Sequence, residues 1–292
     1  MKNTVPPIIT NQNGPVRTLV LNRPHRRNAL NRDLIAALDR ALTEAEADLD
    51  TRCLVLAGAG KSFCAGADLE YFLSLDADGS NPLEFLRTVS AVVKRLETSA
   101  LPVVAALHGH AVAGGLELAL ACDVVVAAES TLIGDGHIRN NLVPGAGSSV
   151  RLPRKVGDSM ARWLALTGTL LPAAELIGTG WLHAVVPDEQ LTDAAQTAAN
   201  QLAGNSGPAQ SAFKSLLFEL TSLDANHGLA HELDAFRDHW KSTDVPAALK
   251  AFLGRRTDTF IADHGRDARL GLSGQAGRPM DDKSSSSPPV RE

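Results

Sequence analysis

Two short glycine-containing stretches constrain the fold of this chain more than any other feature. Residues 64–68 (CAGAD) and 113–117 (AGGLE) each follow an apolar run typical of a buried strand, and each precedes a segment with helical spacing. Glycine turns that join strands to helices are typical of alternating α/β folds. The pattern therefore predicts an α/β core with crossover connections.

The rest of the chain fits this alternation. Strands are expected at residues 17–22, 53–57, 102–107 and 123–128. Asn31 is a predicted N-cap for a helix whose apolar face carries Leu34, Leu38, Leu42 and Leu49, and Pro82 is predicted to start a second amphipathic helix. From about residue 144 the pattern is mainly helical, with segments near 158–167, 172–178, 190–204 and 208–222 and a strand-like break at 183–186.

Composition excludes several classes of protein. A net charge of -5 disfavours broad nucleic-acid binding, and no apolar run is long enough to span a membrane. The three cysteines lie in or beside apolar segments, so they are interpreted as buried free thiols of a cytoplasmic protein. The histidines of residues 108–110 (HGH) could share a metal ion, but no third ligand is placed by the sequence, and no metal is expected.

The two glycine turns also suggest a chemistry. A backbone N–H at the start of a helix has no partner within the helix and lies at the positive end of its dipole. Two such groups converging on one oxygen would form an oxyanion hole, and Glu117 would lie one turn from the polarised carbonyl. This layout suits an enolate intermediate, although ordinary tight turns would have the same sequence.

Four stretches resemble the enoyl-CoA hydratase/isomerase (crotonase) superfamily. They are LNRPHRRNAL (21–30), FCAGADL (63–69), HGHAVAGGLELALACD (108–123) and LVPGAGSSVRLPRKVG (142–157), and the similarity extends over about residues 15–255. The resemblance implies a core of ββα repeats arranged as a spiral (1–195), a helical C-terminal region (196–262) and, from composition, a disordered tail (263–292). It also implies a homotrimer or a dimer of trimers. An acyl-CoA thioester would be the substrate, with no separate cofactor.

The resemblance assigns roles to particular residues. The N–H groups of Ala67 and Gly114 would form the oxyanion hole, and Glu117 matches the first of two glutamates that hydratases use to add water across C2=C3. The second glutamate falls at His137. Histidine could do the glutamate's work, or it could orient substrate while Glu117 acts alone. It could also mark isomerisation, hydrolysis of a β-diketone or thioester hydrolysis, or be an ordinary loop residue.

Further positions are expected around this centre. Asp135 could tune the tautomer of His137 or replace it as a base, and Asp68 is expected to cap the following helix. The acyl pocket should depend on residues 71–73 and the stretch 74–82, with His110 as a further lining residue and no preference for aromatic acyl groups. The remaining substrate or coenzyme A contacts are predicted at Arg26, Arg27, Lys61, Ala65, Gly115, Phe213 and Lys214. The basic residues of 151–155 should lie on the outside of a helix.

Overall fold

The computed structural model describes residues 5–79 and 81–254. It divides the chain into two compact units, Met1–His239 and Trp240–Glu292. The predicted tail at 263–292 lies outside the described residues. The predicted boundary after residue 195 falls within α8 (Leu191–Ala203), and the division into a core and a C-terminal helical region stays a prediction.

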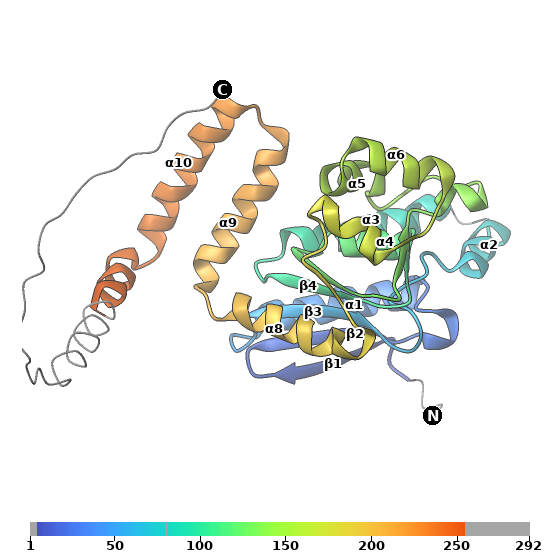
Figure 1. Cartoon of the computed structure of the whole chain (residues 1–292), viewed down its shortest axis with the longest axis horizontal. Helices are drawn as coiled ribbons and strands as arrows, with labels where there is room; N and C mark the ends of the chain where they lie inside the picture. Colours follow the sequence, from blue (N-terminus) through green and yellow to red (C-terminus); the bar gives the residue numbers. More distant parts are fainter. Residues whose placement is uncertain (1–4, 80, 255–292) are drawn as a thin grey trace, which may run out of the picture. The chain divides into compact units, whose positions relative to one another are not determined.

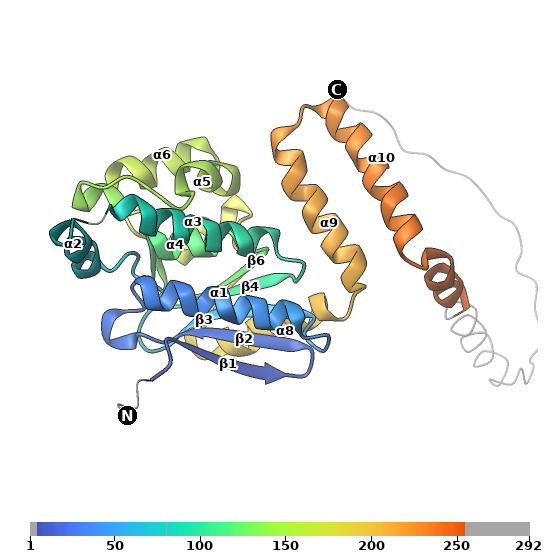
Figure 2. The same cartoon turned by 180° about the vertical axis from the view of Figure 1, so that it is seen from behind.

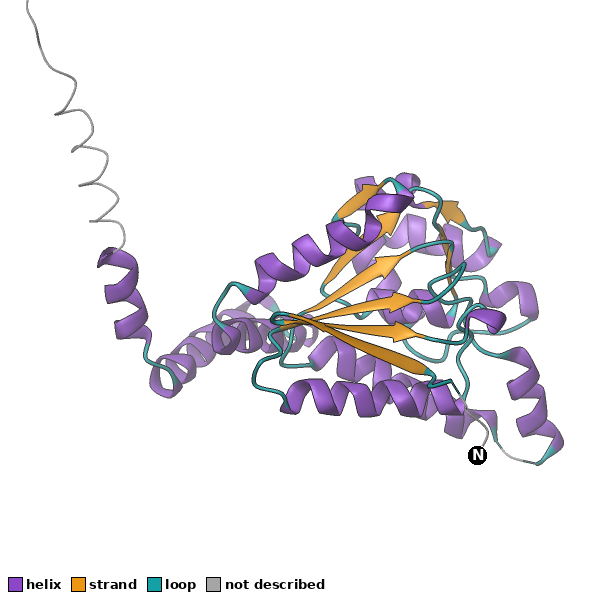
Figure 3. Ribbon diagram, turned by 90° about the horizontal axis from the view of Figure 1, so that it is seen from below, coloured by secondary structure: helices purple, strands orange, loops and turns teal. Residues whose placement is uncertain are grey.

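A six-stranded sheet forms the centre of the first unit (Figure 3). Its order is β1 (Ile8–Asn13), β2 (Val16–Leu21), β3 (Cys53–Gly58), β4 (Val103–Leu107), β6 (Val124–Ala128) and β9 (Ala184–Val186). All neighbours are parallel except β1 and β2. The four predicted strands correspond to β2, β3, β4 and β6, and the strand-like break near 183–186 is β9.

A second, smaller sheet shows how the chain winds into a spiral. It contains β5 (His110–Val112), β7 (Leu132–Gly134) and β8 (Leu171–Pro172). The repeat β4–β5–α4 (Gly114–Leu120) adds one strand to each sheet, and β6–β7 followed by α5 (Ser148–Val156) does the same. Gly109 makes the corner between β4 and β5 with φ of +59°, where an added Cβ would lie 2.0 Å from the Lys61 carbonyl oxygen. The predicted spiral of ββα repeats is confirmed.

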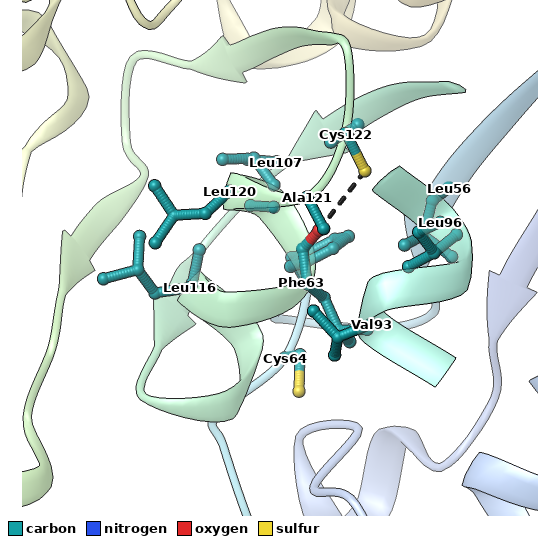
Figure 4. Packing of buried hydrophobic residues seen from close by; sticks show 14 of the residues in the cluster. Leu56, Phe63, Cys64, Val93, Leu96, Leu107, Leu116, Leu120, Ala121 and Cys122 are labelled. Carbon is teal, nitrogen blue, oxygen red and sulfur yellow. Dashed lines mark hydrogen bonds between the residues drawn. The ribbon is translucent and has the colours of Figure 1, made fainter. Parts of the chain in front are cut away.

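Side chains alternate between two hydrophobic layers on the faces of the large sheet. On β3, Leu54 and Leu56 contribute to the larger cluster, whereas Cys53 and Val55 join the cluster under α8. Figures 1 and 2 show α8 on one face and α1 (Arg32–Ala47) and α3 (Pro82–Thr98) on the other. Figure 4 shows Phe63 in the larger cluster, together with Val93 of α3 and Leu116 of α4.

The remaining helices lie between and after the strands along the chain. They are α2 (Leu69–Ala77), α6 (Asp158–Thr167), α7 (Ala173–Leu176), α9 (Gly207–Glu219) and α10 (Ala225–Ser242), with short 3-10 helices η1 (Pro24–Arg26), η2 (His137–Asn140), η3 (Ile177–Thr179), η4 (Asp188–Gln190) and η5 (Leu220–Ser222).

The starts of two helices and the state of the cysteines agree with the predictions from the sequence. Asn31 accepts the N–H of Leu34 at 3.1 Å, and Pro82 begins α3. Leu49 was wrongly assigned to the buried face of α1, because the helix ends at Ala47 and Leu49 is 93% exposed. The cysteines are free and buried, and burial raises the pKa of each thiol to about 12. Among the described residues, no helix could span a membrane. The cytoplasmic location stays a prediction.

Candidate active site

The two glycine turns lie side by side. An added Cβ on Gly114 would lie 3.6 Å from the Ala67 nitrogen and 2.9 Å from a methyl group of Leu30. A short bridge to Leu30 uses the carbonyl of Gly66 and the N–H of Asp68, which leaves the N–H of Ala67 between them. Within residues 5–79 and 81–254, no protein hydrogen bond uses the N–H of Ala67 or of Gly114. Two backbone N–H groups without a protein partner therefore lie on neighbouring turns.

The local sequence explains why these turns can approach so closely. Gly66 has φ of +102°, and an added Cβ on Gly115 would lie 2.2 Å from the Cys64 carbonyl oxygen. Ala113 is held at φ of 51° immediately before α4, and its N–H is fixed by the Gly134 carbonyl at 3.1 Å. The glycines are therefore required by packing as well as by conformation.

Glu117 lies in the first turn of α4 and is buried. Its Oε1 accepts the N–H groups of Ala146 at 2.7 Å and Ser148 at 3.1 Å. Ala146 belongs to the PGAG segment between η2 and α5, and Ser148 is the first residue of α5. They fix one carboxylate oxygen, so Oε2 is the oxygen that faces His137, with Nε2 of that histidine at 3.9 Å.

His137 starts η2 and is oriented by Asp135. Oδ1 of Asp135 accepts the backbone N–H of His137 at 3.3 Å and contacts Nδ1 of its ring at 2.9 Å. The other oxygen of Asp135 accepts the hydroxyl of Ser148. The side chain of His137 is 11% exposed. This placement contradicts the interpretation of His137 as an ordinary loop residue and agrees with Asp135 as the group that sets its tautomer.

Burial and charge shift the pKa values of this cluster. Burial raises the pKa of Glu117, and the hydrogen bonds it accepts only partly oppose this. Burial lowers the pKa of His137, but its hydrogen bond to Asp135 and the two neighbouring carboxylates outweigh burial and raise it overall. Burial also opposes ionisation of Asp135, yet the hydrogen bonds from His137 and Ser148 keep its pKa below the usual value. The site therefore favours an ionised Asp135 beside a protonated His137.

A small cavity of about 60 Å³ brings these groups together. Ala67, Gly114, Glu117 and His137 line it, and the rest of its wall is mostly apolar: Leu30, Phe72, Phe85, Leu86, Val89, Leu142, Val143 and Gly145. Of the predicted pocket residues, Phe72 lines this cavity, whereas Leu73 is 71% exposed. The rings of Phe72 and Phe85 meet edge to face, with centroids 5.6 Å apart.

The basic residues near the first turn lie on the surface. Arg26 pairs with Glu70 at 2.7 Å, and Arg27 and Lys61 are exposed. The backbone of Ala65 donates to the Arg27 carbonyl at 3.0 Å, which places Arg27 beside this turn.

Asp68 has a structural role. Oδ1 accepts the N–H of Tyr71 at 3.3 Å, which confirms the predicted cap of α2, and Oδ2 pairs with Arg23 at 2.8 Å. Both carboxylate oxygens therefore have partners within the protein. A contact of Asp68 with substrate stays a prediction.

His110 and Lys214 also differ from expectation. His110 does not line the cavity, and its Nδ1 contacts the hydroxyl of Ser62 at 3.1 Å. The ammonium of Lys214 binds the carbonyls of Leu96 and Leu101 at 3.1 and 3.0 Å and pairs with Asp123 at 2.7 Å. A lysine is favourable there because the carbonyl of Leu96 lies in the last turn of α3, where carbonyls lack helical partners. Lys214 is thus occupied within its own chain, and its neighbour Phe213 is exposed on α9.

Three residues that support the site were not expected. Asn28 is buried, and its side-chain amide donates to the carbonyls of Ala59, Ser62 and Phe63 just before the first glycine turn. Arg151 was expected on the outside of a helix. Instead it is 12% exposed, binds Glu97 through two nitrogens and donates to the Ala146 carbonyl at 2.9 Å. Ser148 contacts both Glu117 and Asp135. No group of metal-ligating side chains occurs among the described residues.

Comparisons with known proteins identify the family of this chain. The family model for enoyl-CoA hydratase/isomerase matches residues 11–262. The short-chain-enoyl-CoA hydratase of Clostridium acetobutylicum is 32% identical over 250 residues, which cover 85% of this chain and 95% of that protein. The 1,2-epoxyphenylacetyl-CoA isomerase of Escherichia coli is 36% identical over 253 residues, covering 84% and 94%. The crystal structure of an enoyl-CoA hydratase from Bacillus anthracis superposes with a TM-score of 0.78 at 32% identity, covering 85% of this chain and 96% of that one. The chain belongs to the enoyl-CoA hydratase/isomerase family.

Proposed function

We infer that this protein is an enoyl-CoA hydratase, which adds water across the C2=C3 bond of an acyl-CoA thioester. One observation carries the proposal: Glu117 Oε2 and His137 Nε2 face each other at 3.9 Å in the cavity that Ala67 and Gly114 also line. An acid, a base and two oxyanion donors are the groups that water addition requires. The relatives named as hydratases support it.

The backbone donors act on the thioester carbonyl. Its oxygen would accept hydrogen bonds from Ala67 and Gly114, and these bonds strengthen as negative charge develops on that oxygen. A donor of this kind contributes a factor of roughly 10²–10³ to the rate. The N-terminus of α4 adds positive potential at the same place.

The two side chains complete the addition. The ionised Glu117 accepts a proton from water as the water oxygen bonds to C3, and the C2=C3 electron pair moves to form the enolate. The enolate then collapses, and C2 takes the proton from Nε2 of the protonated His137. One water is added overall, and the proton held by Glu117 returns to His137 to restore the starting state.

The coenzyme A part of the substrate needs positive charge at its phosphates. Arg26, Arg27 and Lys61 are exposed beside the first glycine turn, and they are the groups that we propose for this contact. Ala65 and Gly115 shape the two turns. No separate cofactor takes part in this proposal.

Double-bond isomerisation is the alternative activity. The resemblance implies that His137 falls where hydratases have their second glutamate, and a relative with 36% identity is named 1,2-epoxyphenylacetyl-CoA isomerase. Moving a double bond also requires an oxyanion hole and one acid/base group, but no water is added.

Mass-monitored turnover of a panel of enoyl-CoA thioesters separates these activities. We expect an intact thioester that gains one water, and we expect Glu117→Gln to slow this by roughly 10²–10⁴. Glu175→Gln, the same change at an exposed position of α7, serves as the matched control. A product of unchanged mass with a shifted double bond would favour the isomerase. Release of free coenzyme A or a cleaved acyl chain would overturn both activities.

The assembly proposed is a homotrimer or a dimer of trimers. It is supported by large apolar side chains on α9 and α10 that are more than half exposed: Phe213, Leu217, Leu229, Leu233 and Phe236.

A further inference from the structure

Ser148 makes two different contacts that connect the groups of the site. It is the first residue of α5 and is 1% exposed. Its backbone N–H donates to Glu117 Oε1 at 3.1 Å, and its side-chain hydroxyl donates to Asp135 Oδ2. A hydroxyl has a single proton to donate, so this hydrogen bond fixes its direction.

These contacts belong to a closed ring of four residues. Starting at Glu117, the ring passes through the N–H and hydroxyl of Ser148 to Asp135, then to Nδ1 of His137, and returns from Nε2 to Glu117 Oε2 across 3.9 Å. Each contact but the last is a hydrogen bond. A separation of 3.9 Å is too long for a direct hydrogen bond, but one oxygen atom can lie within hydrogen-bonding distance of both groups.

We propose that Ser148 and Asp135 are positioning residues that hold Glu117 Oε2 and His137 Nε2 at the separation at which both contact the same reacting water. This inference rests on the proposed hydratase activity. Asp135 accepts the proton on Nδ1, so that the Nε2–H of the protonated ring is directed toward the reacting atoms. Ser148 keeps Asp135 in place, and through its backbone it keeps Glu117 in place as well.

The ring also explains why a histidine can stand beside Glu117. Two charged groups lie against His137 in the structure. Asp135 lies between β7 and η2, and Glu117 lies on α4. A buried network whose members are all hydrogen-bonded is rigid, whereas one broken contact leaves a buried polar group without a partner. Loss of the Ser148 hydroxyl should therefore loosen His137 without removing any group that touches substrate.

Ser148→Ala tests this because it removes the hydroxyl but retains the backbone N–H to Glu117. We expect kcat to fall about ten-fold or more, as for loss of a hydrogen bond to a charged group, with KM nearly unchanged. Ser149→Ala, a change at the exposed neighbouring serine, is the matched control and should leave both constants unchanged. Equal kcat values for the two variants would overturn the proposal.

A spectroscopic measurement tests the positioning independently of activity. With ¹⁵N-labelled histidine, the His137 signals can be identified among the nine histidines by their loss in His137→Gln. At a pH high enough to make His137 neutral, we expect a single tautomer with the remaining proton on Nδ1 in the parent protein and a mixture of tautomers in Ser148→Ala. An unchanged tautomer in Ser148→Ala would contradict the proposal.

The two measurements also separate this inference from the proposed function. If the parent protein did not hydrate any thioester, the activity would be refuted while the tautomer measurement still tested the ring. If Ser148→Ala did not fold, Asp135→Asn would test the ring from its other side. It retains the size of the side chain but removes the charge, and His137 should then titrate at lower pH in the NMR spectrum.

Discussion

The pKa shifts of Glu117 and His137 predict a pH profile at the scale of single residues. Hydration as proposed needs Glu117 ionised and His137 protonated. Burial raises the pKa of Glu117 above its usual 4.5, so activity should be lost on acidification at a higher pH than for a free glutamate. Burial lowers the pKa of His137, but the contacts with Asp135 and Glu117 together outweigh burial and raise it above 6.5, so the protonated form persists to higher pH. We expect a bell-shaped plot of kcat/KM against pH.

The Asp135→Asn variant tests whether His137 produces the alkaline limb of this profile. Without the negative charge, the imidazolium of His137 loses its main stabilising contact, and its pKa should fall. The alkaline limb should then move to lower pH, and activity above neutrality should fall most. An alkaline limb that did not move would show that His137 is not the acid. Asp188→Asn, at an exposed aspartate that binds Ser130, should leave the profile unchanged.

The close packing of α4 against the first glycine turn predicts that one added methyl group strongly lowers stability and activity. An alanine Cβ at position 115 would lie 2.2 Å from the Cys64 carbonyl oxygen, so the helix would have to move away from that turn. We expect Gly115→Ala to destabilise the fold by about 1–3 kcal/mol and to reduce kcat, because the N–H groups of Ala67 and Gly114 would separate. Gly178→Ala, with no atom within 4 Å of the added Cβ, is the control for thermal denaturation. Equal melting temperatures would contradict the expectation.

Phe85 of α3 forms part of the cavity wall, and its position predicts which acyl-chain lengths the site accepts. Phe85 lines the site cavity and also a second cavity of about 440 Å³, and it contacts Tyr71 edge to face with centroids 5.1 Å apart. A cavity of about 60 Å³ has room for only a few carbon atoms. Phe85→Leu should therefore raise activity on octenoyl-CoA relative to crotonyl-CoA by about ten-fold. Leu83→Ala, at a half-exposed position of the same helix, should not change this ratio.

The elements that were predicted correctly are marked by residues within the elements themselves. Asn31, Pro82 and the apolar strands act through their own neighbours, so they can be recognised in a short window. β1 was missed because five of its six residues are exposed and it lacks an apolar face, although the two residues Gly14 and Pro15 join it to β2 in a hairpin. Leu49 continued the spacing of α1 in the sequence, but the chain leaves the helix before reaching it.

Contacts between distant parts of the chain could not be predicted in the same way. The sequence identified Glu117, His137 and Asp135, but whether His137 faced Glu117 depended on the fold. Lys214 is a long side chain that could reach a ligand or its own chain, and the carbonyl it binds at Leu96 is 118 residues away. Arg151 reaches Glu97 across 54 residues for the same reason. No pattern within one segment specifies such partners.

At the scale of the whole molecule, the exposed apolar side chains of α9 and α10 predict self-association. Leu217 is 55% exposed and Leu233 is 71% exposed, and a protein that remained monomeric would keep this apolar surface in water. We expect light scattering to give three or six times the mass of the 30.8 kDa chain. Leu233→Asp should shift the distribution toward monomer, because a charge placed in an apolar interface is costly. Leu49→Asp is the matched control, since Leu49 is 93% exposed as an isolated surface leucine on another part of the unit. A monomeric mass for the parent protein would refute the assembly, and a Leu233→Asp variant that kept the parent mass would place the interface elsewhere.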